Sequence, residues 1–410
     1  MNASERPAPA TGVIARSAVV ALSLAAFASG ISLRVTDALL PRLAQEFNVP
    51  IGAAASVITV FAVAYGLSQL FFGPMGDRFG KYMVIGWACL ACSISALACA
   101  LAPNFAGLLL ARTAAGATAA AIIPLSMAWI GDVIEYDQRQ PVLARFLIGQ
   151  IMGLSAGVMV GGFAAEHLSW RVPFFGVAAM FVFISIVVLS VNRTLPLHAR
   201  VVRRIAGSAW ARMRSEFSQV LSVPWARVVL ATVFLEGMFL YGAFAFIVSH
   251  LHLRYDVPLA TAGSVVMLFG FGGLLFALGV QTLVRRLGEV GLTRWGGGLV
   301  AVAFLCIAFA PAWWWAIPAC FAAGLGFYML HNTLQINATQ MAPERRGAAV
   351  SAFASCFFLG QSVGVGVNGV LLPRLGTAGI IAMGAVGVLC VALNFSRLRA
   401  RRMAVVRATV

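Results

Sequence analysis

The feature that most constrains the fold of this chain is a succession of long apolar runs separated by short polar or basic segments. Twelve such runs begin near residues 17, 52, 82, 105, 142, 172, 226, 259, 291, 313, 347 and 377. Each has about 20 to 25 residues, enough for a helix to cross a hydrocarbon layer about 30 Å thick. A helix satisfies its own backbone groups in lipid, and the alternating pattern of a barrel strand is absent. The sequence therefore predicts an all-α membrane protein with twelve transmembrane helices.

Composition supports this fold class and excludes several functions. Apolar residues make up 61% of the 410 residues and charged residues only 10%, against about 45–50% and 25% in soluble domains. The net charge of +16 would suit a nucleic-acid-binding protein only if basic residues clustered on a soluble face, whereas here they lie between apolar runs. All seven cysteines fall within predicted spans. We expect no nucleic-acid partner, no metal site and no cofactor.

The basic residues predict the orientation of the chain. Of the 29 Lys and Arg residues, 23 fall in segments on the side of the two termini, four in the opposite loops and two inside spans. Positive loops face the cytoplasm, so both termini should be cytoplasmic in a multi-pass protein of a bacterial inner membrane. The predicted divisions are a tail at 1–16, a six-helix half at 17–192, a basic linker at 193–225, a six-helix half at 226–397 and a basic tail at 398–410.

The two halves are related by an internal repeat. NVPIGAAASVI at Asn48–Ile58 matches DVPLATAGSVV at Asp256–Val266, an offset of 256 − 48 = 208. The tripeptide at Arg78–Gly80 matches that at Arg286–Gly288 with the same offset, since 286 − 78 = 208. Matches at one spacing predict an internal duplication of a six-helix half.

A charged corner separates the second and third runs. The segment Gly73–Lys81, GPMGDRFGK, carries three charges, which are costly in hydrocarbon, so we expect a hairpin loop at a membrane surface. The pattern Gly-x-x-x-Asp-Arg-x-Gly-Lys resembles the signature between the second and third spans of the major facilitator superfamily of secondary transporters. That resemblance implies a gate brace formed by Gly73, Asp77, Arg78, Gly80 and Lys81. The alternative is a basic surface turn in which the acidic residue is incidental.

The equivalent corner of the second half differs in sequence. Arg285 stands where the first half has Asp77, and Gln281 stands where it has Gly73. We therefore expect the two gates to be braced differently, with the first depending on Asp77.

Ionisable residues inside spans are the strongest candidates for coupling to protons, because each is costly in a membrane. Arg34 and Asp37 share a helix face, and Asp37 begins DALLP, which is similar to the first-span motif of twelve-span drug/proton antiporters. Arg112 lies in a segment that resembles the fourth-span motif of the family, and it could pair with Asp37. Burial disfavours the charged form of a lone carboxyl such as Glu236 in the seventh run, so this residue could exchange protons. The alternative is a set of structural ion pairs without coupling to protons.

Glycines recur along the fifth run. Gly153, Gly157, Gly161 and Gly162 allow close helix packing. Their spacing resembles the antiporter motif Gly-x-x-x-Gly-Pro-x-x-Gly-Gly, with Val158 in place of the proline. Packing alone is the alternative explanation.

Polar side chains interrupt the tenth run. His331 and Gln335 share a helix face, and Asn332 lies beside them. These side chains could hydrogen-bond a polar substrate, or they could bond neighbouring helices.

The resemblance to twelve-span proton antiporters implies a function without enzymatic chemistry. It implies a monomeric, lipid-embedded transporter that uses protons to export a small organic molecule, such as a drug, siderophore, sugar or other metabolite, by alternating access. Import of a sugar or organic acid by proton symport is the alternative, because fold does not fix function.

Overall fold

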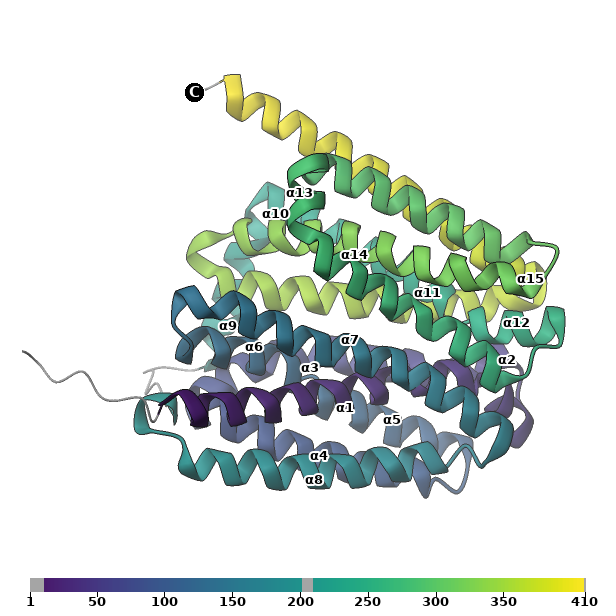
Figure 1. Cartoon of the computed structure of the whole chain (residues 1–410), viewed down its shortest axis with the longest axis horizontal. Coiled ribbons are helices and arrows are strands. Elements are labelled where there is room, and N and C mark those ends of the chain that lie inside the picture. The colour runs from purple at the N-terminus through teal and green to yellow at the C-terminus, as the bar shows by residue number, and fades with distance from the viewer. Residues whose placement is uncertain (1–10, 201–208, 409–410) are drawn as a thin grey trace, which may run out of the picture.

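The computed structural model describes residues 11–200 and 209–408, and these residues are almost entirely helical (Figure 1). Within them, ten helical stretches are long and apolar enough to cross a membrane. The expectation of a helical multi-pass membrane protein is therefore confirmed. The first bundle contains α1 (Thr11–Glu46), α2 (Ile51–Ala54), α3 (Ser56–Phe79), α4 (Lys81–Ala100), α5 (Phe105–Ala119), α6 (Ile122–Val133), α7 (Tyr136–His167) and α8 (Val172–Thr194).

A short 3-10 helix, η1 (Leu197–Arg200), and the helix α9 (Ala209–Ser222) lie in the predicted linker, whose residues 201–208 are outside the described part. The second bundle then follows. It contains α10 (Pro224–Glu236), the π-helical turn η2 (Gly237–Tyr241), α11 (Gly242–Phe244), α12 (Ile247–Tyr255), α13 (Leu259–Phe309), the 3-10 turn η3 (Trp313–Trp315), α14 (Ala316–Gln340), the 3-10 turn η4 (Pro343–Arg345) and α15 (Arg346–Ala408).

The two longest helices are each interrupted at one glycine. Helix α13 has 51 residues and is two helices joined at Gly288, with φ 60° and ψ 179°. Helix α15 has 63 residues and is two helices joined at Gly376, with φ 63° and ψ 173°. A positive φ is readily adopted by glycine, so these residues permit abrupt changes of direction. The predicted ninth and twelfth runs begin near residues 291 and 377, just after the two kinks.

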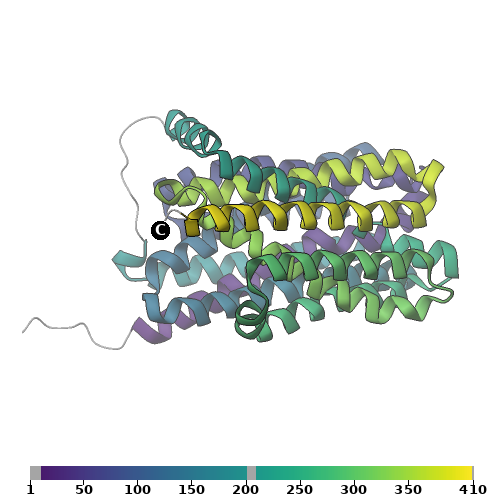
Figure 2. The same cartoon turned by 90° about the horizontal axis from the view of Figure 1, so that it is seen from above.

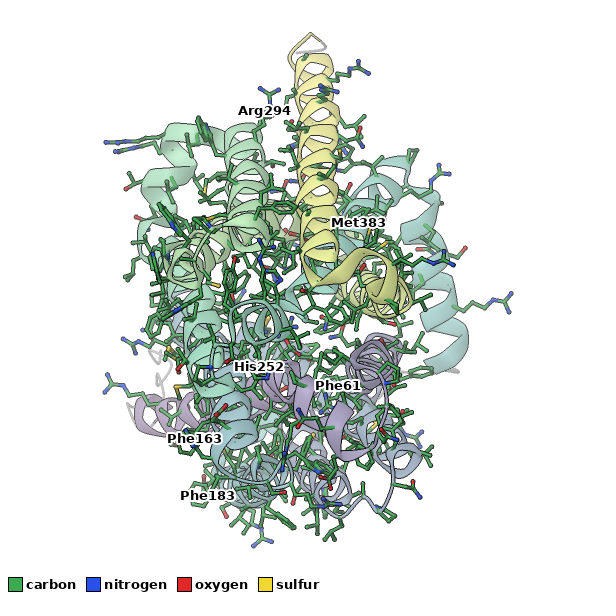
Figure 3. All side chains as sticks on the ribbon, turned by 90° about the vertical axis from the view of Figure 1, so that its right-hand side faces the viewer. Phe61, Phe163, Phe183, His252, Arg294 and Met383 are labelled. Atoms are coloured by element: carbon green, nitrogen blue, oxygen red, sulfur yellow. The ribbon has the colours of Figure 1, made fainter. Side chains whose placement is uncertain are left out.

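The two bundles lie side by side, with their helices roughly parallel to one long direction (Figures 1 and 2). The beginning of α1 and the end of α15 lie at the same end of the molecule, which we call the terminal end. Figure 3 views the molecule from the opposite end, called the far end, and shows the first bundle below the second.

The charged corner has a shorter connection than expected. The predicted loop over Gly73–Lys81 is wrong: α3 continues through Phe79, α4 begins at Lys81, and only Gly80 lies between them. Gly80 has φ 91°, so a single glycine reverses the chain while the helices keep their backbone hydrogen bonds.

The ends of the bundles also extend past the predicted boundaries. Helix α1 starts at Thr11, before the predicted first span, and α15 continues to Ala408, beyond the predicted end of the second half at 397. A helix pairs its own backbone groups, so it can continue past the hydrocarbon without needing new partners. Residues 1–10 of the predicted tail lie outside the described part.

Glycines set the distance between α7 and its neighbours. A Cβ at Gly153 would lie 2.2 Å from the Phe27 carbonyl oxygen of α1, and one at Gly161 would lie 2.2 Å from the Val35 carbonyl oxygen. A Cβ at Gly157 would lie 2.9 Å from the Ile31 carbonyl oxygen. The backbones of α1 and α7 are therefore in direct contact along several turns, a packing mode that membrane helices favour.

The bundles also approach each other closely at the far end. A Cβ at Gly162 would lie 2.4 Å from the Leu259 carbonyl oxygen of α13, and one at Gly52 would lie 2.1 Å from the Gly369 carbonyl oxygen of α15. The Leu259 amide donates a hydrogen bond of 2.8 Å to Glu166 Oε2 at the end of α7. These contacts hold the two bundles together at the far end.

Gly153→Ala tests the packing of α1 on α7. Its Cβ would meet the Phe27 carbonyl oxygen, and overpacking of this kind costs about 1–3 kcal/mol. We expect a lower unfolding temperature for the purified protein in detergent.

Gly73→Ala is the matched control for that substitution. Gly73 lies inside α3 with nothing within 4 Å of the position of a Cβ, and alanine is favoured over glycine in a helix by about 0.5–1 kcal/mol. The control should unfold at the wild-type temperature or above it. Equal unfolding temperatures for both variants would contradict the packing role of Gly153.

Candidate functional site

An ion pair from the first bundle lies against an aromatic ring of the second. Arg34 Nη1 is 3.2 Å from Asp37 Oδ2, and both residues are buried. The Arg34 guanidinium carbon lies 3.7 Å from the centroid of the Tyr241 ring, which belongs to the π-helical turn η2. The other carboxyl oxygen, Asp37 Oδ1, has no hydrogen-bond partner in the described residues. The ion pair is thus placed at the interface of the two bundles, with one acceptor unused.

A second buried carboxyl belongs to the second bundle alone. Glu236 is the last residue of α10 and has no solvent exposure. Its Oε2 lies 2.9 Å from His331 Nδ1 of α14, and its Oε1 has no hydrogen-bond partner within residues 11–200 and 209–408. The π-helical turn begins at the next residue, Gly237, and single π turns in helices are frequent at functional sites.

Aromatic rings connect the two polar pairs. The Phe357 ring centroid is 4.8 Å from that of His331 and 5.5 Å from that of Tyr241. The Phe327 ring centroid is 5.0 Å from that of His331 and 5.4 Å from that of Tyr241. A continuous set of contacts therefore runs from one carboxyl to the other. We call this set the central site: Arg34, Asp37, Glu236, Tyr241, Phe327, His331 and Phe357.

The central site is nearly closed in this structure. A cavity of about 20 Å³ lies between the bundles, and Arg34, Tyr241, Phe244 and Tyr328 are among the residues that line it. Pockets for small molecules usually measure about 300–1,000 Å³. Room for a ligand at this place therefore requires the bundles to move apart.

Arg112 contacts groups other than the expected carboxylate. Its Nη1 donates to the Ser32 carbonyl at 3.0 Å, its Nε to the Val57 carbonyl at 3.3 Å and its Nη2 to Thr36 Oγ1 at 3.4 Å. A direct pair with Asp37 is therefore absent among the described residues, and the predicted pairing is wrong. Neighbouring residues of a helix point in different directions, so Arg112 meets the side of α1 that carries Thr36 and leaves Asp37 to Arg34.

The polar side chains of the tenth run divide between two places. His331 belongs to the central site, while Asn332 and Gln335 are half-buried and make no hydrogen bond in the described part of the chain. Asn337 turns to the terminal end, where its Nδ2 donates to Glu289 Oε2 at 3.0 Å. The run thus links the central site to a second polar cluster.

The first cluster at the terminal end is built on the charged corner. Lys81 Nζ lies 3.1 Å from Asp77 Oδ1 and 2.6 Å from Asp132 Oδ2 at the end of α6. Arg78 is exposed, with its guanidinium carbon 5.1 Å from the centroid of the Phe79 ring. The corner therefore ties α3, α4 and α6 together through one lysine.

The second cluster has the opposite charge at its centre. Glu289 follows the kink at Gly288 and accepts from Arg399 Nε at 2.8 Å and Arg399 Nη2 at 3.1 Å. Glu289 corresponds to Lys81 through the repeat offset, since 289 − 81 = 208. The second corner has Arg285 at the position of Asp77, as the sequence showed, and its central charged residue is Glu289. Sequence reasoning missed this contact because its partners are 110 residues apart.

Comparisons with known proteins agree with this arrangement. The family model of the Major Facilitator Superfamily matches residues 22–365. An uncharacterised MFS-type transporter of Bacillus subtilis, YceJ, is 24% identical over 349 residues, covering 84% of this chain and 86% of that protein. The quinolone resistance protein NorA of Staphylococcus aureus is 23% identical over 375 residues, covering 86% of this chain and 92% of that protein.

Two solved structures share the fold. One is a bacterial homolog of the human lysosomal transporter Spinster, with a TM-score of 0.75, 16% identity and coverage of 95% of this chain and 98% of that chain. The other is the nucleoside transporter NupG, with a TM-score of 0.74, 14% identity and coverage of 92% and 98%. At these identities the likeness shows the fold alone.

Arg34→Gln tests the ion pair of the central site. Removing the guanidinium leaves Asp37 buried without its partner, and breaking a buried pair costs about 3–5 kcal/mol. We expect a large loss of thermal stability in detergent. The double variant Arg34→Gln/Asp37→Asn should recover most of it, because no unpaired charge remains; a double variant as unstable as the single one would argue against the pair.

The two polar clusters of the terminal end can be tested separately by hydrogen exchange. Asp77→Asn should speed amide exchange in a peptide covering residues 77–84, and Glu289→Gln should do so in one covering 289–296. Partly exposed ion pairs contribute about 0.2–1 kcal/mol, or up to about fivefold in local opening.

Arg285→Gln is the control for both variants, since Arg285 is exposed and has no ion-pair partner among the described residues. It should leave exchange in both peptides unchanged. If Arg285→Gln and Asp77→Asn had equal effects, the role of Asp77 as a brace would be wrong.

Proposed function

Because the chain belongs to the major facilitator superfamily, we propose that it is a proton-coupled secondary transporter that exports a small organic molecule by alternating access. Similarity to the quinolone resistance protein NorA over most of both chains supports the export direction.

The proposed location is a bacterial inner membrane, crossed twelve times by a monomer. The kinks at Gly288 and Gly376 support this count, because each divides a helix far longer than a lipid layer needs.

The proposed orientation places the terminal end in the cytoplasm. The excess of basic residues on that side supports it. The close contacts of Gly52 with Gly369 and of Gly162 with Leu259 then lie toward the outside. They support a conformation in which the outer gate is closed.

One observation carries the proposal of proton coupling: two buried carboxyls each keep one oxygen without a hydrogen-bond partner in the described residues. An unpartnered buried oxygen is costly when charged and less costly when the carboxyl takes up a proton. Asp37 and Glu236 are therefore the proposed proton sites. They belong to different bundles, so a change at either one can alter how the bundles meet.

Arg34 is the proposed link between protonation and movement. While Asp37 is charged, its partner Arg34 is held 3.7 Å from the Tyr241 ring across the interface. A proton on Asp37 removes the charge that balances Arg34 and weakens the ion pair. The guanidinium then becomes free to turn from Tyr241, which loosens one contact between the bundles.

His331 is the proposed link between Glu236 and the substrate. The ring of His331 bonds Glu236 and packs on Phe327 and Phe357. A substrate that displaced this ring would disturb the partner of Glu236. Aromatic rings offer large apolar faces, and the free amides of Asn332 and Gln335 offer donors and acceptors. We expect an aromatic molecule with a few polar groups.

Amide variants in proteoliposomes test proton coupling. Asp37→Asn and Glu236→Gln keep the size of each side chain and remove its proton exchange. We expect each variant to lose most of the transport that an imposed pH gradient drives, followed with a pH-sensitive dye in the lumen as candidate aromatic substrates are added. Gradient dependence that is undiminished in both variants would overturn the assignment.

Glu46→Gln is the matched control, because Glu46 lies at the end of α1 and pairs with Arg171 at 3.2 Å, away from the central site. Glu46→Gln should keep the transport that the pH gradient drives in the wild type.

Reversing the pH gradient separates the two directions of transport. An exporter moves substrate against the proton flux, and an importing symporter moves substrate in the same direction as the protons.

A further inference from the structure

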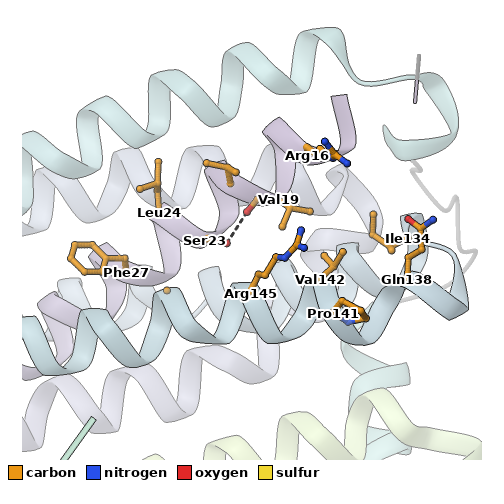
Figure 4. A pocket seen from close by; sticks show the side chains of 12 residues that line it. Arg16, Val19, Ser23, Leu24, Phe27, Ile134, Gln138, Pro141, Val142 and Arg145 are labelled. Carbon is orange, nitrogen blue, oxygen red and sulfur yellow. Dashed lines mark hydrogen bonds between the residues drawn. The ribbon is translucent and has the colours of Figure 1, made fainter. Parts of the chain in front are cut away.

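A large groove lies outside the central site, between α1 and α7 at the terminal end (Figure 4). Its volume is about 990 Å³. We propose that this groove, called the lateral groove, binds one anionic phospholipid, with the headgroup phosphate at its arginines and an acyl chain along its apolar wall. It is lined by Arg16, Val19, Val20, Ser23, Leu24, Phe27, Ile134, Gln138, Pro141, Val142, Arg145 and Gly149.

The lateral groove faces the lipid and not the second bundle. Figure 4 shows α8 along one side of the groove and the pale green helices of the second bundle beyond α7, on the side away from it. Every residue that lines the groove comes from the first bundle. Val20 is 58% exposed and Leu24 is 40% exposed. The groove shares no lining residue with the cavity at the central site, so the two are separate.

The length of the groove matches one leaflet of a bilayer. Its lining extends from residue 16 to 27 on α1 and from residue 138 to 149 on α7. Eleven residue steps of helix measure about 16 Å, and half of the hydrocarbon core measures about 15 Å. An acyl chain that runs beside α1 therefore fits between the membrane surface and the middle of the bilayer.

The charges of the groove favour an anionic headgroup. Arg16 and Arg145 are its charged lining residues, and no carboxylate lines it among the side chains that the structure describes. Both arginines are exposed, and neither has an ion pair or hydrogen bond in the described part of the chain. In Figure 4, Arg145 extends from α7 across the groove toward α1. Guanidinium groups bind phosphate through paired hydrogen bonds, and their long stems can reach the membrane surface.

The remainder of the wall is apolar. The Ser23 hydroxyl donates to the Val19 carbonyl at 2.9 Å, so this polar atom is already satisfied within α1. The side chains of Val20, Leu24 and Phe27, which line the groove, then offer apolar surface to an acyl chain.

A second lipid-facing groove in the same molecule provides an internal comparison. It has a volume of about 710 Å³ and is lined by residues of α10 and α15 that include Leu235, Phe239 and Met383. Its described lining residues include none with a charge. It can accept an acyl chain but gives no preference for an anionic headgroup, so selectivity should depend on the lateral groove.

Thermal unfolding with added lipid tests the proposal. Full-length protein, delipidated in detergent, is titrated with phosphatidylglycerol or with phosphatidylcholine that has the same acyl chains. We expect phosphatidylglycerol to raise the unfolding temperature more, and the difference to disappear in Arg16→Gln/Arg145→Gln. The double variant should bind phosphatidylglycerol about 25-fold more weakly, from two contributions of about fivefold each. Native mass spectrometry should show one retained phosphatidylglycerol on the wild type and none on the double variant.

Three results would overturn the proposal. The first is an equal rise in the unfolding temperature of the wild type with phosphatidylglycerol and with phosphatidylcholine. The second is a larger rise with phosphatidylglycerol that persists in the double variant. The third is loss of the preference in the control Arg227→Gln, because Arg227 is an exposed residue of α10 outside the groove. Inorganic phosphate separates a lipid from a free anion: it should give no shift, and a shift equal to that of phosphatidylglycerol would contradict an acyl-chain site.

Discussion

The absence of water in the lipid core is the constraint on which the rest of this structure depends. It forces backbone groups to pair within each segment, which makes nearly every described residue helical. It also removes the usual hydrophobic force between helices, so close backbone contact has to hold them. Gly153 and Gly161 bring α7 onto α1, and Gly162 and Gly52 bring one bundle onto the other. The position of Arg34 and Asp37 on α1 depends on these contacts.

The same constraint explains how charges are treated inside the molecule. A buried charge needs a partner, and the structure has two kinds. Arg112 is satisfied by backbone carbonyls and a hydroxyl of neighbouring helices, which makes it part of the framework. Asp37 and Glu236 are satisfied through only one oxygen each. These two carboxyls are the proposed proton sites. Glu236 directly precedes the π-helical turn that carries Tyr241, and Asp37 pairs with Arg34, which lies against the Tyr241 ring.

Particular residues show how far sequence reasoning reached. The repeat offset of 208 aligns Gly288 with Gly80 in the sequence, and both glycines have a positive φ at a reversal of the chain. The buried carboxyls were found because an acidic residue inside an apolar run is rare and costly. The pairing of Arg112 with Asp37 was not correct, and the contact of Glu289 with Arg399 was missed. Both depend on the rotation of one helix against another, which no local pattern contains.

The sequence by itself determined the membrane class, the helical fold and the ionisable residues that lie inside apolar runs. Hydrophobic length and the cost of charge in lipid depend on a short stretch of residues, so they can be recognised in a linear chain. Only the tertiary structure decided the partners that come from different helices: His331 for Glu236 and Lys81 for Asp132. A partner is chosen by which helix faces meet, and glycine contacts between distant segments set those faces.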